Sequence, residues 1–435
     1  APERCGVLKR NIPLSRLLYT LVLAATGLLG GCSSSTVRLM PTPTLFTGSD
    51  PVLHVDEPDA GRDTTIQILY ATNRLPAGPP EAPNYTRERA EQLRFGVATL
   101  RVGDGTKTWE SLREMSTSAV EGERPEITLQ SMREMAVLDH SADAPGPDAE
   151  AFFAYVDQLI RRGSNQDILI YVHGANTNFE RAAAQAAQFQ HFLGRDAVVM
   201  VFAWPSAGSM LRYRRDVATA RDTESTFARL LELLAAHTQA AHVNVLAYSA
   251  GAMIASPGLA RAADQAATAT AEKNLRLGEI YYAAPDIDFP VFVDNLPRYE
   301  DQVRRVTGAL NMSDRALSFA EWFNRVSRAG RPNLADIGPD ETRWLVAASG
   351  REELDVLSIR PEELPGLPAT SHAFWYDHPW VSSDILLKLR FHVPPRTRGL
   401  DPNSTEIALA FWTFPTDYPQ RLPAVARELA KDRNQ

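Results

Sequence analysis

The stretch VNVLAYSAG, from Val243 to Gly251, decides the fold of this chain. Its apolar run ends at Tyr248, and an alanine-rich segment with high helix propensity follows Gly251. The pattern predicts a strand, a sharp turn and a helix, with Ser249 at the apex of the turn. Such serine turns usually read Gly-x-Ser-x-Gly, and here Ala247 takes the place of the first glycine. Alanine is a mild departure, because the position only needs a residue small enough for the strand and helix backbones to approach each other.

Ser249 has two interpretations. A serine before a helix is most often an N-cap. At the apex of a tight strand-to-helix turn, a serine can instead expose its Oγ above the sheet edge as a nucleophile. One Ser-x-Gly does not separate the two, so the surrounding chain has to decide.

The composition is that of a globular protein: 435 residues, 44% hydrophobic and 23% charged. The formal net charge of -8 argues against nucleic acid as the main partner, because binding to phosphates needs a basic face. The sequence contains no HExxH, no Cys-His array and no glycine-rich phosphate loop. We therefore expect neither a metal nor an organic cofactor.

Residues 1–31 have the pattern of a secretory signal peptide. Basic residues, the last of them Arg16, precede a short apolar run that ends in Leu29-Gly30-Gly31-Cys32. This ending resembles the lipobox of bacterial lipoproteins, which implies cleavage before Cys32 and a lipid on its thiol. The alternative is an ordinary signal with an incidental cysteine. An acidic residue after the cysteine often implies retention in the inner membrane, and residue 33 is a serine, so we expect a cell-envelope lipoprotein at the outer membrane.

Composition also divides the remaining chain. Residues 32–62 are rich in Ser, Thr, Pro and Asp and are predicted to form a flexible tether. Residues 63–395 alternate between strand and helix patterns and are predicted to form the main domain. Residues 396–435 form a C-terminal extension whose placement the pattern does not determine.

The predicted elements indicate an α/β protein. Runs 65–71 and 94–102 look like antiparallel opening strands on either side of a proline-rich loop. Further strands are predicted at 167–172, 197–203, 243–248, 277–284, 302–310 and 353–359, and helices at 152–162, 179–193, 223–236, 315–325 and 382–391. The helix after Ser249 is expected to be interrupted at Pro257. Because the later strands are apolar throughout, we expect a mostly parallel central sheet with helices on both faces.

Reactive residues matter most just after strands, because an open α/β sheet places its site at the carboxyl ends of the strands. His173-Gly174-Ala175-Asn176 follows one predicted strand, where a hydrolase places the loop that supplies an oxyanion-hole N–H. The N–H of Ala175 and the N–H of Ala250, the residue after Ser249, are the expected donors. His173 itself is not the expected base, because it precedes the nucleophile in the chain.

Three histidines follow Ser249 in the chain: His372, His378 and His392. In folds that carry such a serine turn, the catalytic residues occur along the chain in the order nucleophile, acid, base. His372 lies in a loop after the last predicted strand and is the favoured base, with His378 as the alternative. His392 ends the last predicted helix, away from the strand tips.

The chain resembles bacterial α/β-hydrolases of unknown function, in the esterase/lipase superfamily, over residues 39 to about 390. The shared landmarks are LMPTP (39–43), ILYATNR (68–74), RFGVATL (94–100), DILIYVHGANTNFERAAAQAAQF (167–189), FAWPSAGSMLRYRRD (202–216), VNVLAYSAG (243–251), AAPDID (283–288), SDRAL (313–317), RAG (328–330) and SHAFWYDHPWVSSDILLKL (371–389). The resemblance implies an α/β-hydrolase fold with Ser249 as nucleophile, His372 as base and an aspartate as orienting acid. Ala247 departs from the family pattern, as does Ala175, where a bulkier residue is common; neither change removes a reacting group.

Three aspartates are candidates for the acid: Asp286, Asp288 and Asp314. Each could instead be a helix cap or a turn residue. Asp314 is favoured because the acid usually follows the second strand after the serine turn, and because SDRAL stands where the family has an aspartate at a strand end. The residues that could line a pocket are His173, Asn176, Tyr248, Asp286 and Asp288.

These observations predict a serine hydrolase that cleaves carboxylic esters through an acyl-enzyme intermediate. Its substrate is expected to be a small-molecule or lipid-like ester, and its membrane contact the lipid on Cys32. Lipase, thioesterase and amidase variants share these residues. The alternative is a vestigial hydrolase fold in an envelope lipoprotein that acts as a binding or scaffold protein, since a fold does not guarantee activity.

Overall fold

The computed structural model describes residues 36–47, 63–79, 83–119, 122–139, 144–163, 165–195, 197–209, 212–268, 274–351 and 353–432. The expected signal peptide, the expected lipidation site Cys32 and residues 48–62 of the expected tether lie outside the described residues. Residues from Val37 onward pack as one compact unit. Within the described part of the chain, no helix is both long and apolar enough to cross a bilayer.

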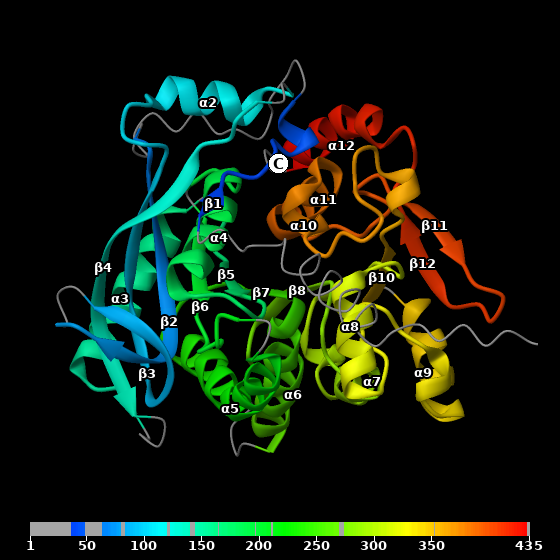
Figure 1. Ribbon diagram of the computed structural model, residues 1–435, viewed down its shortest axis with the longest axis horizontal. Coiled ribbons are helices and arrows are strands. Elements are labelled where there is room, and N and C mark those ends of the chain that lie inside the picture. Colours follow the sequence, from blue (N-terminus) through cyan, green and yellow to red (C-terminus); the bar gives the residue numbers. More distant parts are fainter. Residues whose placement is uncertain are drawn as a thin grey trace, which may run out of the picture. The chain divides into compact units, whose positions relative to one another are not determined.

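The described residues form a sheet of 12 strands in the order β1-β4-β3-β2-β6-β5-β7-β8-β9-β10-β12-β11 (Figure 1). Its strands are β1 (Val37–Arg38), β2 (Thr65–Ala77), β3 (Asn84–Val102), β4 (Glu126–Asp139), β5 (Ile168–Val172), β6 (Val198–Phe202), β7 (Val243–Tyr248), β8 (Leu277–Ala283), β9 (Arg305–Leu310), β10 (Leu354–Ser358), β11 (Asp401–Ser404) and β12 (Ala410–Thr413). Strands β1 to β4 pair antiparallel, and every pair from β2·β6 to β10·β12 is parallel. Only the last pair, β11·β12, is again antiparallel among the described strands.

Helices cover both faces of this sheet. They are α2 (Trp109–Thr117), α3 (Pro147–Arg162), α4 (Phe179–Phe192), α5 (Tyr213–His237), α6 (Ala252–Thr268), α7 (Phe289–Asn295), α8 (Arg315–Asn324), α9 (Pro339–Ser349), α10 (Phe374–Asp377), α11 (Pro379–Phe391) and α12 (Tyr418–Asp432). Apolar residues of α3, α5, α6, α7 and α9 form one core with one face of the sheet, and those of α2, α4, α10, α11 and α12 form a second core with the other face. The predicted α/β architecture, with antiparallel N-terminal strands, is confirmed.

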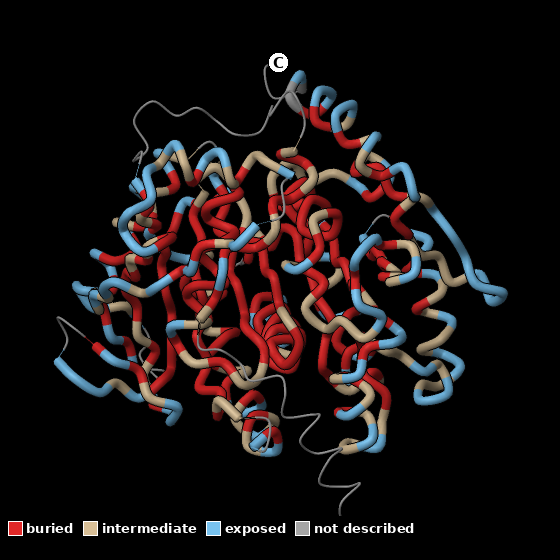
Figure 2. The backbone as a smooth tube through the Cα atoms, turned by 45° about the horizontal axis from the view of Figure 1, so that its top comes forward, coloured by how far each residue is buried: buried red, intermediate tan, exposed pale blue. Residues whose placement is uncertain are grey.

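The two cores follow from strands that are buried on both sides. In β5, Ile168 and Ile170 join one core, whereas Leu169 and Tyr171 join the other, because successive side chains of a strand point to opposite faces. Figure 2 shows the central strands buried along their whole length. Continuous apolar runs in the sequence are the signal of this arrangement.

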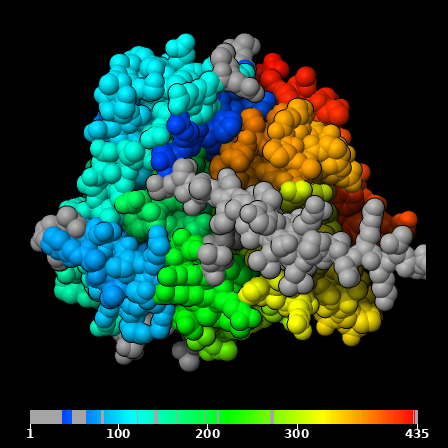
Figure 3. Space-filling view, in the orientation of Figure 1, coloured from blue at the N-terminus to red at the C-terminus, as the bar shows by residue number. Residues whose placement is uncertain are grey.

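The prediction of a flexible tether is wrong for residues 36–47. Leu39 and Phe46 are buried, and the Phe46 ring stacks on Phe192 at 5.7 Å. The backbone N–H of Leu45 donates to Ser383 Oγ at 3.1 Å. This segment lies between strand β4, with which β1 pairs, and helix α11, which carries Ser383 (Figure 3). Its apolar side chains are spaced among prolines without a helix or strand period, which is why their pattern does not reveal their burial.

The C-terminal extension belongs to the same unit. Strand β12 joins the sheet edge beside β10, with Leu357 opposite Trp412. Helix α12 returns over the second core, where Tyr418 contacts the Trp380 ring at 5.8 Å. A second expectation is also corrected, since α6 continues through Pro257 without the predicted interruption.

Candidate active site

Ser249 lies at the carboxyl end of β7, in a single 3₁₀ turn that leads into α6. Its φ angle is 52°, in the left-handed region that non-glycine residues rarely adopt. A Cβ at Gly251 would overlap Val172 O, so glycine is required where the turn crosses the neighbouring strand. Ala247 is fully buried, which agrees with the need for a small residue there. The local sequence thus produces the sharp turn that projects the Ser249 side chain.

His372 reaches this serine from the loop between β10 and α10. Its Nε2 lies 2.7 Å from Ser249 Oγ, and its Nδ1 lies 2.5 Å from Asp314 Oδ2. Asp314 follows β9 and is fully buried. The structure therefore brings together three predicted residues from the carboxyl ends of three parallel strands.

Asp314 makes two kinds of contact with its two carboxylate oxygens. Its Oδ1 accepts hydrogen bonds from the N–H groups of Ala316 and Leu317 and so caps α8. Its Oδ2 faces His372. Because a carboxylate only accepts hydrogen bonds, this contact requires the proton of the neutral ring on Nδ1, which leaves Nε2 free to accept the Ser249 hydroxyl proton.

The charge of Asp314 also sets the basicity of His372. Burial disfavours the charged imidazolium, but attraction and hydrogen bonding to Asp314 outweigh it, and the pKa of His372 is raised from its ordinary value. A histidine with a raised pKa is a stronger base. The arrangement suits proton transfer from a hydroxyl.

The loop after β5 packs against the serine turn. A Cβ at Gly174 would lie 3.1 Å from the Ser249 Cβ, so the loop approaches the serine turn closely at Gly174, one residue before Ala175. His173 is fully buried, and its ring stacks on Trp204 at 5.3 Å. Burial and the nearby Arg74 lower the pKa of His173 to about 3. His173 is therefore a neutral side chain that shapes the loop.

Two buried charged residues hold this loop, and sequence reasoning did not single them out. Asp216 Oδ2 accepts from the N–H of Asn176 at 3.3 Å and from Ser206 Oγ at 3.1 Å. The Arg74 guanidinium donates to Thr177 O at 2.9 Å. Both residues lie inside quoted landmarks, ILYATNR and FAWPSAGSMLRYRRD, so the signal was present without an assigned role.

Asp286 and Asp288 do not contact His372; they share a buried arginine. Arg328 Nε donates to Asp286 Oδ1 at 2.6 Å, and Arg328 also forms an ion pair with Asp288. Tyr213 donates its hydroxyl to Asp286 Oδ2 at 2.8 Å. The N–H of Asp286 donates to Ser249 O at 3.0 Å. The two aspartates thus fix Arg328 beside the segment that follows β8, and this segment contacts the Ser249 backbone through Asp286.

Asn311 links the segments that carry Asp314 and His372, and it was missed by the sequence reasoning. Its side-chain amide donates to Ser371 O at 2.8 Å, one residue before His372. Its Oδ1 accepts from the N–H of Ser313 at 3.0 Å, one residue before Asp314. Asn311 is fully buried at the end of β9. An asparagine at a strand end has no distinctive pattern, so only the folded structure reveals this link.

The remaining predicted residues have other positions. The Tyr248 ring lies 5.3 Å from the His372 ring and 5.1 Å from that of Trp375, so it borders the site. His378 caps α11 by accepting from the N–H of Trp380. His392 follows α11 at the amino end of the sheet, far from the serine in the fold.

Comparison with known families agrees with this architecture. The family described as "alpha/beta hydrolase of unknown function (DUF900)" matches residues 149–360. The matched segment runs from α3 to the end of β10 and includes Ser249 and Asp314, whereas His372 follows it. No curated protein matches the chain. The fold is that of an α/β-hydrolase.

Proposed function

We propose that this protein is a serine hydrolase that cleaves carboxylic esters through an acyl-enzyme intermediate. The observation that carries the proposal is the continuous chain of contacts from Ser249 Oγ through His372 to Asp314. Nucleophile, base and orienting acid within hydrogen-bond reach of one another are the features that activate a serine. The left-handed turn at Ser249 adds support, because it aims the hydroxyl at the base.

The first half of the reaction forms the acyl-enzyme. Ser249 Oγ attacks the ester carbonyl carbon while His372 Nε2 accepts the hydroxyl proton, which gives a tetrahedral intermediate. The N–H groups of Ala250 and Ala175 are the proposed donors to its oxyanion, and such a donor contributes about 3–4 kcal/mol in measured cases. The intermediate collapses when the imidazolium returns the proton to the departing alkoxide, so the alcohol leaves.

The second half regenerates the enzyme. His372 takes a proton from water, and the resulting hydroxide attacks the acyl carbon. The imidazolium then protonates Ser249 Oγ as the carboxylic acid leaves. Asp314 keeps the ring orientation and stabilises its positive charge in both halves without taking the proton. These steps need no group beyond the residues of this chain and water.

We propose that the substrate is a small-molecule or lipid-like ester. Asp314 begins α8, whose Phe319 and Trp322 are 42% and 74% exposed. Large exposed apolar side chains on the helix that Asp314 begins favour an apolar substrate, because such exposed surface often marks a binding site. A panel of p-nitrophenyl esters of rising acyl length tests this part: turnover should rise from acetyl to a medium-length acyl chain. A steady decline with chain length would contradict it.

Active-site labelling tests the chemistry itself. A fluorophosphonate should label the wild-type protein at Ser249, and Ser249→Ala should abolish the label. Ser256→Ala is a matched control, because Ser256 is a buried serine of the adjacent helix whose hydroxyl hydrogen-bonds with Asn295 and with the Tyr282 and Tyr299 hydroxyls rather than with His372. Absence of labelling and of turnover with every ester would favour the vestigial binding or scaffold protein.

We further propose that a lipid on Cys32 attaches the enzyme to the cell envelope, at the outer membrane. The proposal is supported by the basic, apolar and Leu-Gly-Gly-Cys pattern of residues 1–32. Cys32→Ser should move the protein out of the membrane fraction and leave ester hydrolysis intact. A variant that stays firmly bound to membranes would contradict the anchor.

A further inference from the structure

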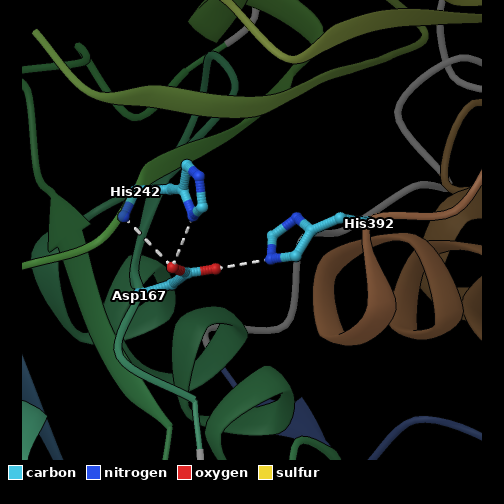
Figure 4. Close-up of side chains that lie close together, drawn as sticks. All are labelled: Asp167, His242 and His392. Atoms are coloured by element: carbon cyan, nitrogen blue, oxygen red, sulfur yellow. Dashed lines mark hydrogen bonds and ion pairs between the residues drawn. The ribbon is translucent and has the colours of Figure 1, made fainter. Parts of the chain in front are cut away.

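A cluster of two histidines and an aspartate lies at the amino ends of the parallel strands (Figure 4). Asp167 directly precedes β5, and His242 directly precedes β7. His392 follows the last residue of α11. Ser249 leaves β7 at its other end, so the cluster and the proposed catalytic centre lie at opposite edges of the sheet.

The three side chains point at one another. His392 Nε2 lies 2.7 Å from Asp167 Oδ2, and His242 Nδ1 lies 3.0 Å from Asp167 Oδ1. The two rings are 5.2 Å apart between centroids, and one ligand atom from each of the three residues lies within 4.8 Å of the others. In Figure 4 one nitrogen of each ring faces the carboxylate between them.

We propose that His242 Nδ1, His392 Nε2 and one carboxylate oxygen of Asp167 bind a single divalent transition-metal ion of the Zn²⁺ class. Two imidazole nitrogens and one carboxylate oxygen are a typical three-ligand set for zinc, with water in the fourth position. Ligand atoms around tetrahedral zinc are roughly 3.3 Å apart, given bond lengths of about 2.0–2.1 Å. The two nitrogen–oxygen distances of 2.7 and 3.0 Å come close to this value, and all ligand atoms lie within 4.8 Å of one another. A rotation of the partly exposed His242 ring would bring its nitrogen to the distance that zinc needs.

A second layer of polar groups orients these ligands. Glu279, fully buried in β8, has Oε1 3.5 Å from His392 Nδ1. A carboxylate behind one ring nitrogen holds the proton there and directs the lone pair of the other nitrogen to the metal. Asn244 performs the same task for the aspartate, because its amide donates to Asp167 Oδ2 at 3.2 Å.

The charges of the cluster are compatible with a dication. Lys388 is fully buried and forms an ion pair with Glu279, so the charge of that carboxylate is balanced within the second layer. Asp167 remains as the carboxylate available to the ion. The His242 side chain is 33% exposed, which leaves a route for the ion from solvent.

Such an ion would join three segments that are far apart in the chain. It would hold the starts of β5 and β7 to the end of α11, the helix that follows the loop carrying His372. Binding to the folded state alone stabilises that state. The predicted effect is therefore stabilisation of the folded state, and it is independent of the chemistry proposed at Ser249.

The test is zinc binding by the purified, untagged protein after treatment with a chelator and dialysis. Competition with a chromogenic chelator should give one tight equivalent of Zn²⁺ per chain, and Zn²⁺ should raise the melting temperature. Co²⁺ in its place should give the intense visible bands of a tetrahedral site. Wild-type protein that takes up no zinc under these conditions would overturn the proposal, and the cluster would then be a hydrogen-bonded staple only.

Three variants locate the ion. His242→Gln and His392→Asn should each weaken zinc binding at least tenfold and remove the thermal shift; asparagine suits the left-handed backbone of residue 392. His237→Gln is the matched control, because His237 is an exposed histidine outside the cluster, and it should bind zinc as the wild type does. Circular dichroism checks that each variant folds. Unchanged zinc affinity in both cluster variants would place the ion elsewhere and overturn the assignment.

Discussion

Two aspartate–histidine pairs lie at opposite edges of the parallel part of the sheet, and each brings a carboxylate oxygen within 2.7 Å of a ring nitrogen. At the carboxyl ends, the other nitrogen of His372 faces the Ser249 hydroxyl. At the amino ends, the other nitrogen of His392 faces the Glu279 carboxylate, and Asp167 is shared with a second histidine. The aspartate–histidine contact is common to both sites, so the third partner determines which chemistry each pair supports.

Electrostatics alone does not distinguish the two pairs. Burial opposes the charged ring of His392, but hydrogen bonds to Asp167 and Glu279 raise the pKa of His392 to about 8. The pKa of His372 is raised by Asp314 against the same opposing effect of burial. What differs is the group at the second ring nitrogen: Ser249, in a left-handed turn after β7, faces His372 Nε2, whereas Glu279 faces His392 Nδ1. Geometry around the second nitrogen is therefore the better criterion for a catalytic pair.

The largest expected effect comes from removing the Ser249 hydroxyl, the group that distinguishes the His372 pair from the His392 pair. Ser249→Ala should lower kcat by about 10⁶-fold, as in serine enzymes whose nucleophile is removed. Its melting temperature should change little, because the substitution removes only one hydroxyl group from a small side chain. Steady-state hydrolysis of a p-nitrophenyl ester and thermal melting measure the two quantities. Retention of more than a small fraction of turnover would place the reacting group elsewhere.

The next largest effect is expected for Asp314, and it is compared with that for Asp167, the aspartate of the other pair. Asp314→Asn should lower kcat by roughly 10⁴-fold, because the neutral side chain no longer favours the reactive tautomer or the imidazolium. Asp167→Asn should instead lower the free energy of unfolding by about 1–3 kcal/mol, the usual cost of weakening a buried hydrogen-bonded group. Kinetics and chemical denaturation separate the two outcomes.

The alternative acids supply the control for that comparison. Asp286→Asn and Asp288→Asn should lower kcat far less than Asp314→Asn, since both carboxylates bind Arg328. If Asp314→Asn stays within about tenfold of the wild type while either other variant loses activity, Asp314 is the wrong acid.

A smaller effect tests the link between acid and base. Asn311→Ala removes the hydrogen bond to Ser371 O and should lower kcat by about 10–100-fold, because small displacements of a base are costly. KM should change much less than kcat. Combining it with Asp314→Asn should cost less than the sum of the two separate losses, since both act through His372. Simple additivity would mean that Asn311 does not act through the Asp314–His372 pair.

The smallest effect concerns pH. Only the neutral His372 ring accepts a proton, so turnover should fall as the pH drops below the raised pKa of His372. The negative charge of Asp286 contributes to raising that pKa, so Asp286→Asn should shift the acid limb of the kcat/KM profile to lower pH. A pH series of kcat/KM for both proteins measures the shift, and a movement to higher pH would contradict the sign.

The order of strands and reactive residues along the chain predicts much of the sheet and of the candidate site. Apolar strand runs predict the parallel sheet. The rule that reactive residues follow strands, taken with chain order and the family resemblance, favours Ser249, Asp314 and His372 over the alternatives, and the structure brings these three into contact. The same rule considers only carboxyl ends. It therefore passed over Asp167 and His242, which precede strands, and regarded His392 as the end of a helix.

Non-local contacts explain the other gaps. Asp216 and Asn311 act on backbone groups brought close only by folding, and neither has a pattern in its own neighbourhood. Residues 36–47 look like a tether because prolines interrupt their apolar residues, so no helix or strand period is visible. In the structure those apolar side chains are buried against the sheet and α11. The short strands β11 and β12 pair at the sheet edge, where period and hydrophobicity are both weak.

If Cys32 carries the proposed lipid, the packing of residues 36–47 limits the distance between the folded unit and the membrane. Val37 already pairs with Ile127 in the sheet, and only five peptide steps separate it from Cys32. A fully extended chain of that length spans at most about 17 Å. With the proposed lipid on Cys32, the domain is confined to a thin layer above one bilayer surface and moves by lateral diffusion. Its search for substrate becomes two-dimensional, so the density of esters in that layer, rather than their bulk concentration, sets how often it meets one.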